Sequence, residues 1–404
     1  MDKSQVKPGT LLLSEQPFVY ILSSKFRTEH CDFCFVKKDL QRCSSCQYVY
    51  YCGKACQREG WSLHKLECAN LKKVAPRIVP DAGRLLSLLI KKLGKDGNNI
   101  KSYYTKTKYR KFKDLMSHYP NIKEDPVRME HFTSLYGVLG EFLGNEFIPN
   151  PVELLGIYGR MCVNSFNICD EELKGLGTGI YLAASIIDHS CQPNAVATFQ
   201  GTLLNIRATE QMPHLNGTNY TDTLQKSEVR RKDLMSTYYF LCKCPRCLDP
   251  EETKIMSAGV CPNTKCNAAL QLSAEEMGIV INVIDLDVCK VCLRKHEGVL
   301  HHLNIQHVRI LDSAFESSID FRQWDDARKF GVALIPGFKK YLGNVHPLLG
   351  LLYLKLAKIL SFQGDVNEAK KNLKESCNIL KITHGESSNL YKNEIIPLIQ
   401  ECMM

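Results

Sequence analysis

The chain has 404 residues, of which 44% are hydrophobic and 24% charged, and its formal net charge is +9. This composition is typical of globular proteins and argues against disorder, and the length predicts two to four domains. No apolar run approaches the roughly 18 residues that a membrane span needs, and the N-terminus lacks the apolar stretch of a secretory signal. We therefore expect an intracellular protein without membrane contact.

The first 30 residues contain two strand signals, Leu11–Leu13 and Phe18–Leu22, separated by a turn-like Ser14–Pro17. A dense block of Cys and His follows at 31–68. Leucines at helical spacing then predict a helix from Asp81, a plausible N-cap, to about Leu93, where Gly94 would end it. A second helix is predicted from about Met129 to Phe142.

The segment 70–130 holds fifteen Lys/Arg and six Asp/Glu, so it accounts for the entire formal charge. Aromatic side chains are interleaved with these basic residues, which would suit contact with nucleic acid or an acidic partner. A solvated helical face is the alternative interpretation. The aromatic residues are Tyr103, Tyr104, Tyr109 and Phe112.

The second half of the chain changes character twice. Residues 175–207 are rich in strand formers and turn glycines, whereas only helices are expected after about Glu297. The segments beginning at Trp324 and Val366 repeat at a spacing of 42 residues, and Asp365 with Glu368 forms a capping-box pattern. This repeat predicts stacked helix pairs similar to TPR units, or else an unrelated helical bundle.

The Cys/His block offers eight soft metal ligands within 38 residues, enough for two tetrahedral zinc sites. Because so short a segment buries little apolar surface, the metals would provide most of its folding free energy. Spacing alone does not reveal which pairs share an ion. The ligands are Cys31, Cys34, Cys43, Cys46, Cys52, Cys56, His64 and Cys68.

Two further cysteine clusters follow. The triplet Cys242, Cys244 and Cys247 lacks a fourth ligand, and Cys191 is the natural donor. The third cluster is a zinc-ribbon-like set of four cysteines, so three zinc sites are expected and a fourth is possible. This last set comprises Cys261, Cys266, Cys289 and Cys292, which leaves Cys162, Cys169, Cys377 and Cys402 as buried thiols.

The motifs resemble a known family when they are taken in order. Residues 31–68, with Gln57, Trp61, His64 and Cys68 at their end, are similar to a MYND finger. A second set of motifs follows the order found in SET domains. It consists of Asn164-Ser165-Phe166, Gly179-x-Tyr181, His189-Ser190-Cys191-x-Pro193-Asn194, Tyr220, Phe240 and the cysteine triplet. The whole chain resembles the SET–MYND lysine methyltransferases, nearest the third member, although the cluster at 261–292 is not expected in that branch.

The resemblance implies an α+β fold in which a β-rich SET domain is split by the MYND finger and a helical insert. The implied units are the N-terminal part of SET (1–30), the finger (31–68), the insert (69–160), the core SET domain (161–225), the post-SET zinc segment (226–250), the additional cysteine segment (251–296) and a TPR-like helical domain (297–404).

The resemblance also implies ligand sets and roles. Zinc ligands interleave in the family, so Cys31, Cys34, Cys52 and Cys56 would bind one ion, and Cys43, Cys46, His64 and Cys68 the other. The cofactor would be S-adenosylmethionine, and Tyr220, Phe166 and Tyr238 would form a channel for the substrate lysine. Cofactor contacts are expected from Asn164, Ser185, Asp188, His189 and Phe240.

Several positions depart from the family pattern. The Gly-x-Gly turn before the first strand is absent, which leaves open whether Met1 is the true start. Asp188 replaces the usual Asn, and the cofactor-binding positions of the insert fall on Met116 and His118. The stretch before Tyr220 is rich in turn formers, so Tyr220 is expected to be loosely held.

Two functions from different classes follow. The first is a protein-lysine methyltransferase that depends on S-adenosylmethionine and acts on histone or other protein lysines. The alternative is a catalytically inactive adaptor that binds partner peptides through the finger and the helical tail. Either protein is expected to be a monomer in the cytoplasm and nucleus, and the sequence does not identify the substrate lysine or the finger's partner.

Overall fold

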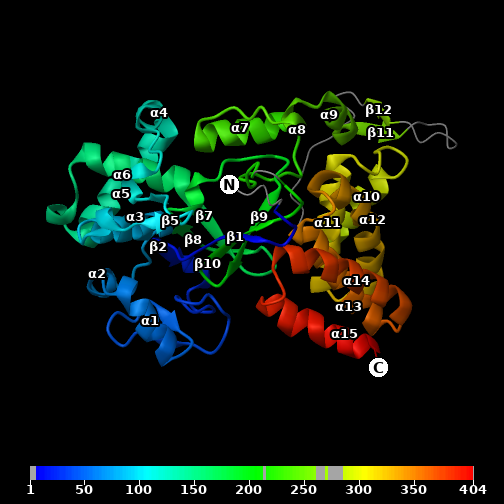
Figure 1. Cartoon of the computed structure of the whole chain (residues 1–404), viewed down its shortest axis with the longest axis horizontal. Helices are drawn as coiled ribbons and strands as arrows, with labels where there is room; N and C mark the ends of the chain where they lie inside the picture. The colour runs from blue at the N-terminus through cyan, green and yellow to red at the C-terminus, as the bar shows by residue number, and fades with distance from the viewer. Residues whose placement is uncertain (1–5, 213–214, 261–268, 272–284, 404) are drawn as a thin grey trace.

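The computed structural model describes residues 6–212, 215–260, 269–271 and 285–403 (Figure 1). Two three-stranded antiparallel sheets lie near the middle of the molecule, with the helices of residues 54–164 on one side and the C-terminal helices on the other. This mixture of helices and small sheets confirms the predicted fold class.

The central sheets join the beginning of the chain to residues far along it. Strand order is β1-β10-β9 in one sheet and β2-β8-β7 in the other, so each N-terminal strand pairs with a strand beyond residue 170. The strands predicted at 11–13, 18–22 and within 175–207 are confirmed. Their bounds are β1 (Leu11–Glu15), β2 (Val19–Leu22), β7 (Ser165–Cys169), β8 (Gly175–Ile180), β9 (Ala195–Gln200) and β10 (Leu203–Ala208).

Everything between β2 and β7 is therefore an insertion into one sheet. The insertion consists of the Cys/His segment followed by a helical part, and both share one apolar core with the edge of the sheet. Its elements are β3 (Gln41–Arg42), β4 (Tyr50–Tyr51), α1 (Lys54–His64), α2 (Cys68–Val74), α3 (Asp81–Leu93), β5 (Ser102–Tyr103), β6 (Tyr109–Arg110), α4 (Tyr119–Glu124), α5 (Pro126–Leu143) and α6 (Pro151–Asn164).

Helix α3 has the predicted bounds, but Asp81 does not cap it. Pro80 occupies the N-cap position, and Asp81 is the first helical residue. Its carboxylate instead accepts hydrogen bonds from the Ser23 hydroxyl (2.7 Å) and the Ser24 backbone N–H (3.0 Å). The carboxylate thus joins α3 to the end of β2, a tertiary use that local sequence does not reveal.

The C-terminal part is helical, as predicted. Helices α11 and α12 form one packed pair and α13 and α14 another, and the second helices of the two pairs begin 42 residues apart, at Trp324 and Val366. The Asp365 side chain accepts a hydrogen bond from the Glu368 backbone N–H (3.4 Å), which is one of the two hydrogen bonds of the predicted capping box at the start of α14. Elements after β10 are α7 (Ser227–Tyr238), α8 (Pro245–Leu248), α9 (Pro250–Met256), β11 (Ala258–Val260), β12 (Ala269–Gln271), α10 (Leu286–His296), α11 (Ile305–Asp320), α12 (Trp324–Leu342), α13 (Pro347–Phe362), α14 (Val366–Thr383) and α15 (Ile396–Met403).

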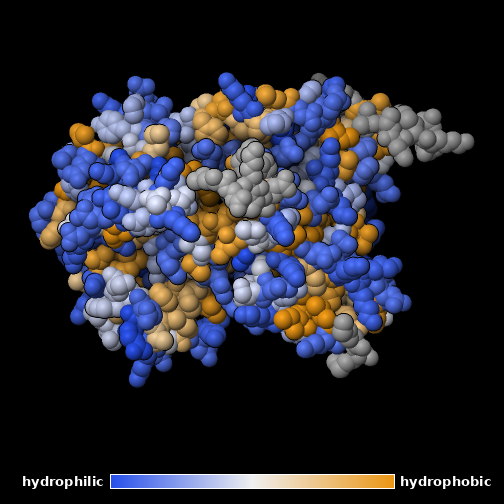
Figure 2. All heavy atoms as spheres, viewed as in Figure 1, coloured by the Kyte–Doolittle hydropathy of each residue, from blue (hydrophilic) through white to orange (hydrophobic). Residues whose placement is uncertain are grey.

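The C-terminal helices pack against the central strands, with α14 in contact with β10 (Figure 1). The Thr198 hydroxyl on β9 donates to the Thr383 carbonyl at the end of α14 (3.3 Å), and the Glu171 carboxylate accepts from the Asn389 backbone N–H (3.1 Å). On the face in Figure 2, apolar side chains are interspersed with hydrophilic ones and form no continuous band. Among the described residues, no helix combines the length and apolarity needed to cross a bilayer.

Candidate zinc centres and aromatic pocket

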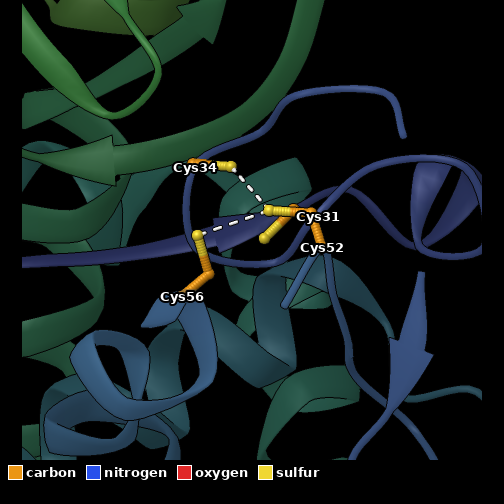
Figure 3. Close-up of side chains that lie close together, drawn as sticks. All are labelled: Cys31, Cys34, Cys52 and Cys56. Carbon is orange, nitrogen blue, oxygen red and sulfur yellow. Dashed lines mark hydrogen bonds between the residues drawn. The ribbon is translucent and has the colours of Figure 1, made fainter. Parts of the chain in front are cut away.

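Four cysteines of the inserted segment converge on one point, as Figure 3 shows. Cys31 and Cys34 lie in the loop before β3, Cys52 follows β4, and Cys56 is on α1. The Cys34 and Cys52 sulfurs are 3.7 Å apart, and all four sulfurs lie within 4.8 Å of one another. Tetrahedral zinc with bonds of about 2.3 Å separates two sulfur ligands by about 3.8 Å. The spacing therefore fits a zinc ion.

A second group interleaves with the first along the chain and is fully buried. It consists of Cys43, Cys46, His64 and Cys68, with all ligand atoms again within 4.8 Å. The Cys43 and Cys68 sulfurs are 3.9 Å apart, and the Cys46 sulfur is 3.5 Å from His64 Nε2. The structure thus brings together the two ligand sets that the family resemblance implied, and both support zinc binding.

A buried ionic cluster connects this second group to α3. The other ring nitrogen of His64, Nδ1, lies 3.5 Å from the Glu67 carboxylate. The Arg84 guanidinium, only 2% exposed, donates to Glu67 (2.6 Å) and to Asp32 (3.1 Å). Burial raises the pKa of Glu67, but Arg84 and His64 together outweigh burial, so the pKa is lowered overall. A carboxylate beside a metal-bound His fixes the orientation of the ring.

Sequence reasoning missed this cluster, although a signal was present. Arg84 directly precedes the leucines that predicted α3, and it faces the core with them. A charged side chain within an apolar stripe is rarely buried unless it is paired. Arg84 therefore belongs to the internal structure, which also means that part of the basic charge of segment 70–130 is not available at the surface.

The third group is formed by Cys191 and the cysteine triplet, as predicted. The ligand atoms of Cys191, Cys242, Cys244 and Cys247 lie within 4.8 Å of one another, and the Cys191 and Cys247 sulfurs are 3.4 Å apart. Arg230 of α7, with no exposed surface, donates to the Cys247 sulfur (3.6 Å). Its positive charge stabilises thiolates, and no sequence motif pointed to it.

Of the predicted zinc-ribbon-like cluster at 261–292, the structure describes two of the four cysteines. Cys289 and Cys292 lie on α10, and Cys289 is buried in the apolar core of the C-terminal helices. Cys261 and Cys266 lie outside the described residues. This zinc site remains a prediction.

A cavity of about 260 Å³ lies between the end of α6, β7, β9 and the end of α7. Its walls include five residues to which the resemblance gave roles in catalysis or cofactor binding. Ala197 and Phe199 of β9, which sequence reasoning did not single out, form another wall. The five predicted residues are Asn164, Phe166, Ser185, Tyr220 and Tyr238.

Tyr220 is firmly positioned in this cavity, contrary to the expectation of a loose hold. Its hydroxyl donates to the Ile187 carbonyl, and its backbone N–H donates to His189 Nδ1 (3.0 Å). The preceding Thr218 pairs with His189 as a parallel bridge. Gly217 permits this pairing because its φ is +126° and a Cβ would lie 2.3 Å from the Asp188 carbonyl oxygen. The turn-forming residue Gly217 thus allows the backbone before Tyr220 to lie close to Asp188.

His189 connects the third cysteine group to Tyr220. Because the Tyr220 N–H donates to Nδ1, that nitrogen carries no proton, and Nε2–H is left to donate to the Cys191 sulfur 3.1 Å away. Burial, together with Arg230, lowers the pKa of His189 to about 4, so the ring stays neutral at physiological pH. A single neutral imidazole thus links a cysteine ligand to the pocket.

Three of the residues assigned to the cofactor lie beside the cavity, outside its lining. The His189 ring is 5.9 Å from Phe240 between centroids, and Phe240 is 6.4 Å from the cavity residue Tyr238. The Asp188 carbonyl accepts a hydrogen bond from the Thr218 backbone N–H (3.0 Å). An aromatic surface therefore continues from the cavity toward the end of α7.

Residues 31–68 match the MYND finger family. Over almost its whole length the chain is also similar to curated lysine methyltransferases. It is 30% identical to mouse (Mus musculus) histone-lysine N-methyltransferase SMYD3 over 408 residues, covering 98% of this chain and 93% of that protein. The chain belongs to the SET–MYND lysine methyltransferase family.

Other relatives of this SET–MYND chain are more distant but similarly complete. Histone-lysine N-methyltransferase ASHR1 of Arabidopsis thaliana is 26% identical over 432 residues, covering 96% of this chain and 89% of its own. Human (Homo sapiens) N-lysine methyltransferase SMYD2 is 26% identical over 402 residues, with coverages of 94% and 90%. The family assignment therefore covers the strands, the insertion and the helical end together.

In this SET–MYND chain, the insert reaches the cavity through two contacts. Asn164 Nδ2 donates to the Met116 carbonyl (2.8 Å), and Arg110 donates to the Ser185 carbonyl (2.7 Å). The segment that includes Met116 and His118 thus lies beside Asn164. The sequence indicates Arg110 only as part of the basic segment 70–130, because its place beside Ser185 depends on the tertiary fold.

Proposed function

We propose that this protein transfers a methyl group from S-adenosylmethionine to a lysine side chain of a histone or another protein. The observation that carries the proposal is the 260 Å³ cavity, because it gathers Phe166, Tyr220 and Tyr238 around one space. An aromatic tunnel suits the apolar stem and the amine of lysine, and the family membership supports the same chemistry.

The types of residue around the cavity suit the binding of S-adenosylmethionine. The neighbouring rings of His189, Tyr238 and Phe240 provide an aromatic surface for adenine, and Asn164 and Ser185 provide polar groups at the cavity. When bound there, S-adenosylmethionine supplies a methyl group on a positively charged sulfur, which becomes a neutral thioether once the amine displaces it. No carboxylate is offered by Met116 or His118, so we expect binding to depend strongly on stacking.

The aromatic walls prepare the lysine for attack. A free lysine amine has a pKa near 10.4 and must lose its proton before it can act as a nucleophile. Phe166, Tyr220 and Tyr238 exclude water, and desolvation disfavours the charged ammonium form. The same walls hold the amine in one direction, and such positioning is a large part of the rate enhancement in a displacement reaction.

The Tyr220 hydroxyl orients the amine without acting as its base. Its proton is directed to the Ile187 carbonyl, so the oxygen is left to accept a hydrogen bond from a substrate amine. Burial, reinforced by Asp188 and Tyr238, raises the pKa of Tyr220. The hydroxyl therefore stays protonated at neutral pH, and the proton of the lysine ammonium has to leave to solvent.

Calorimetric titration with S-adenosylhomocysteine, combined with a radiolabelled methyl-transfer assay on histones and other proteins, tests the proposal. We expect saturable binding that is lost in Phe240→Ala. Tyr220→Phe should retain binding but lower turnover about 100-fold, because it removes an oriented polar group from the reacting site. Phe321→Ala, at an exposed aromatic residue outside the cavity, serves as the control. A folded, zinc-loaded protein with no detectable binding would refute the proposal.

We also propose that the MYND finger binds a peptide partner. Trp61 of α1 is 47% exposed although its ring lies 5.7 Å from that of the ligand His64. An exposed aromatic residue on a rigid, metal-held surface is a typical anchor site for a peptide. Trp61→Ala should weaken binding on a peptide array while zinc content and turnover stay unchanged. Salt-dependent binding of a DNA duplex instead would favour the basic segment 70–130 as the partner surface.

A further inference from the structure

A cavity of about 700 Å³ lies among α10, residues 297–302, α11 and α12, in the C-terminal half of the chain. It is far along the chain from the three cysteine groups described above and from the aromatic pocket, whereas α10 also carries Cys289 and Cys292 of the predicted cluster at 261–292. One third of the chain's twelve histidines line it. They are His296, His301, His302 and His307.

Two of these histidines are held with their ring nitrogens face to face. His296 is the last residue of α10, and His307 is in the first turn of α11. Their Nδ1 atoms are 3.4 Å apart. At this distance the two rings can share a hydrogen bond, and tetrahedral zinc with bonds of about 2.0–2.1 Å likewise separates two nitrogen ligands by about 3.3–3.4 Å. The separation therefore matches two ligands of one metal ion.

The protonation of the pair is compatible with metal binding. Burial lowers the pKa of His296, and burial together with His296 and His302 lowers that of His307 to about 4. Both rings are thus neutral at pH 7 and can turn a lone pair toward a cation.

The charged side chains of the cavity wall largely offset one another. Lys290 forms an ion pair with Asp326 (2.5 Å), while Glu297 lies on the wall together with Arg294 and Lys329. Within the described ranges, groups of three or more close ligand atoms occur only in the three cysteine-containing groups. A metal in this cavity therefore needs a mobile third ligand.

His302 is the best candidate for that third ligand. It is exposed and lines the same cavity, and its ring acts electrostatically on His307. His301 is less suited because its Nδ1 already accepts the Leu303 backbone N–H (3.2 Å). We propose that His296, His307 and His302 bind a divalent metal ion of the zinc type, with at least one coordination position open to the cavity.

Such a site differs in kind from the cysteine groups. Imidazole ligands suit Zn²⁺, Ni²⁺ and Cu²⁺, and a set that includes one mobile ligand binds less tightly than four fixed thiolates. The ion would also bridge α10 and α11 across the connection 297–304. Because α10 carries Cys289 and Cys292, the metal would couple the additional cysteine segment to the C-terminal helices.

The test uses the full chain with its cysteine sites already loaded with zinc. Calorimetric titration with further Zn²⁺ should reveal one additional equivalent. Co²⁺ bound at this site should give a spectrum without the sulfur-to-metal charge-transfer band that cysteine ligands produce. We expect His296→Gln and His307→Gln each to weaken this binding at least tenfold, and His302→Gln to weaken it as well.

His131→Gln is the control, because His131 is an exposed histidine outside the cavity whose Nδ1 hydrogen-bonds with the Tyr158 hydroxyl. It should bind the additional equivalent like the unmodified protein. Failure to bind any additional equivalent, or unchanged binding in the double variant of His296 and His307, would overturn the proposal. Since His302 is exposed, its variant keeps the test valid if a buried substitution disturbs folding. The readout is independent of methyl transfer.

Discussion

The histidine-containing group of the MYND finger and the Cys191 group both gather soft ligands, but the charges around them differ. In the finger, a carboxylate stands behind a ligand: Glu67 contacts His64 and is itself held by Arg84. Around the Cys191 group, hydrogen-bond donors point at the sulfurs, since Arg230 donates to Cys247 and His189 to Cys191.

Ligand charge explains this difference. Zinc with four thiolates carries two net negative charges, whereas three thiolates and a neutral histidine leave one. Donors therefore stabilise the first type, and a carboxylate can support the imidazole of the second. The outer contacts also lead to different places: those of the finger lead to the structural helix α3, and those of the Cys191 group lead to Tyr220. Zinc in the finger should matter for stability, and zinc at Cys191 for catalysis.

Loss of a ligand in the group beside the pocket gives the largest expected effect. Cys191→Ser should lower zinc content by one ion and reduce methyl transfer at least about 100-fold, because Cys191 no longer accepts from His189 and the zinc that fixes this region is lost. Elemental analysis and the transfer assay measure the two effects. Cys377→Ser, at a cysteine of α14 outside all the predicted zinc groups, is the control. Full activity after loss of that ion would contradict the proposed link.

Removal of Arg84 tests the finger side of the comparison. Arg84→Met leaves Asp32 and Glu67 buried without their partner, and breaking a buried pair in this way costs about 3–5 kcal/mol of unfolding free energy. Urea unfolding followed by Trp61 fluorescence, in a Trp324→Phe background, reports on the finger.

The matched control is Arg77→Met, which breaks the exposed pair of Arg77 with Glu141. Surface pairs are worth little, so the free energy of unfolding should change by about 0.5 kcal/mol or less. Similar losses in the two variants would show that the buried cluster has no special role.

A more conservative substitution tests the hydrogen bonds of His189 separately from its aromatic ring. His189→Phe keeps an aromatic ring beside Phe240 but removes the acceptor of Tyr220 and the donor to Cys191. We expect zinc at this group to be bound about 10- to 100-fold less tightly, with lower turnover and unchanged zinc release from the finger. Competition with a chromophoric chelator resolves the two kinds of site. If both kinds release zinc as before, the hydrogen bonds are not needed.

The smallest effect concerns the helices behind the Cys191 group. His346 caps α13 by accepting the Leu348 N–H, and burial together with Arg246 lowers its pKa to about 4. As the pH falls, His346 takes up its proton first in the unfolded chain, where its pKa is near 6.5. Its contribution to the free energy of unfolding is therefore fully present above pH 6.5 and is lost progressively toward pH 4.

This contribution should decrease by about 1 kcal/mol between pH 7 and 5.5. His346→Asn keeps a neutral cap and should remove that part of the pH dependence of urea unfolding. Other acid-sensitive groups, including the zinc ligands, act equally on both proteins and cancel in the difference. Parallel pH profiles would assign the cap no role.

The sequence predicted features that depend on local pattern or on family resemblance. Strands, α3, the C-terminal helix pairs and the Asp365 cap follow from periodicity and turn residues. Spacing indicated that Cys31 and Cys34 act as a pair, but only the resemblance implied their sharing an ion with Cys52 and Cys56. The structure brings these four together, because β4 and α1 return the chain to the first loop.

What could not be predicted depends on distant partners. The sequence predicts Asp81 as a helix cap, yet its carboxylate accepts hydrogen bonds from Ser23 and Ser24, almost 60 residues earlier. The firm hold on Tyr220 comes from His189 and Ile187, more than 30 positions away. Local sequence shows that a polar group needs a partner, but not which one the fold will supply.

The pairing of β2 with β8 also bears on the order of events during synthesis. Val19 lies opposite Ile180, so this pair closes only after the whole insertion between them has been made. Both zinc ligand sets of the finger lie within residues 31–68, and local contacts form sooner than distant ones. As the chain leaves the ribosome, we expect the finger to bind its metals before β8 has been synthesised and can pair with β2. Zinc supply would then influence this protein before its central sheet exists.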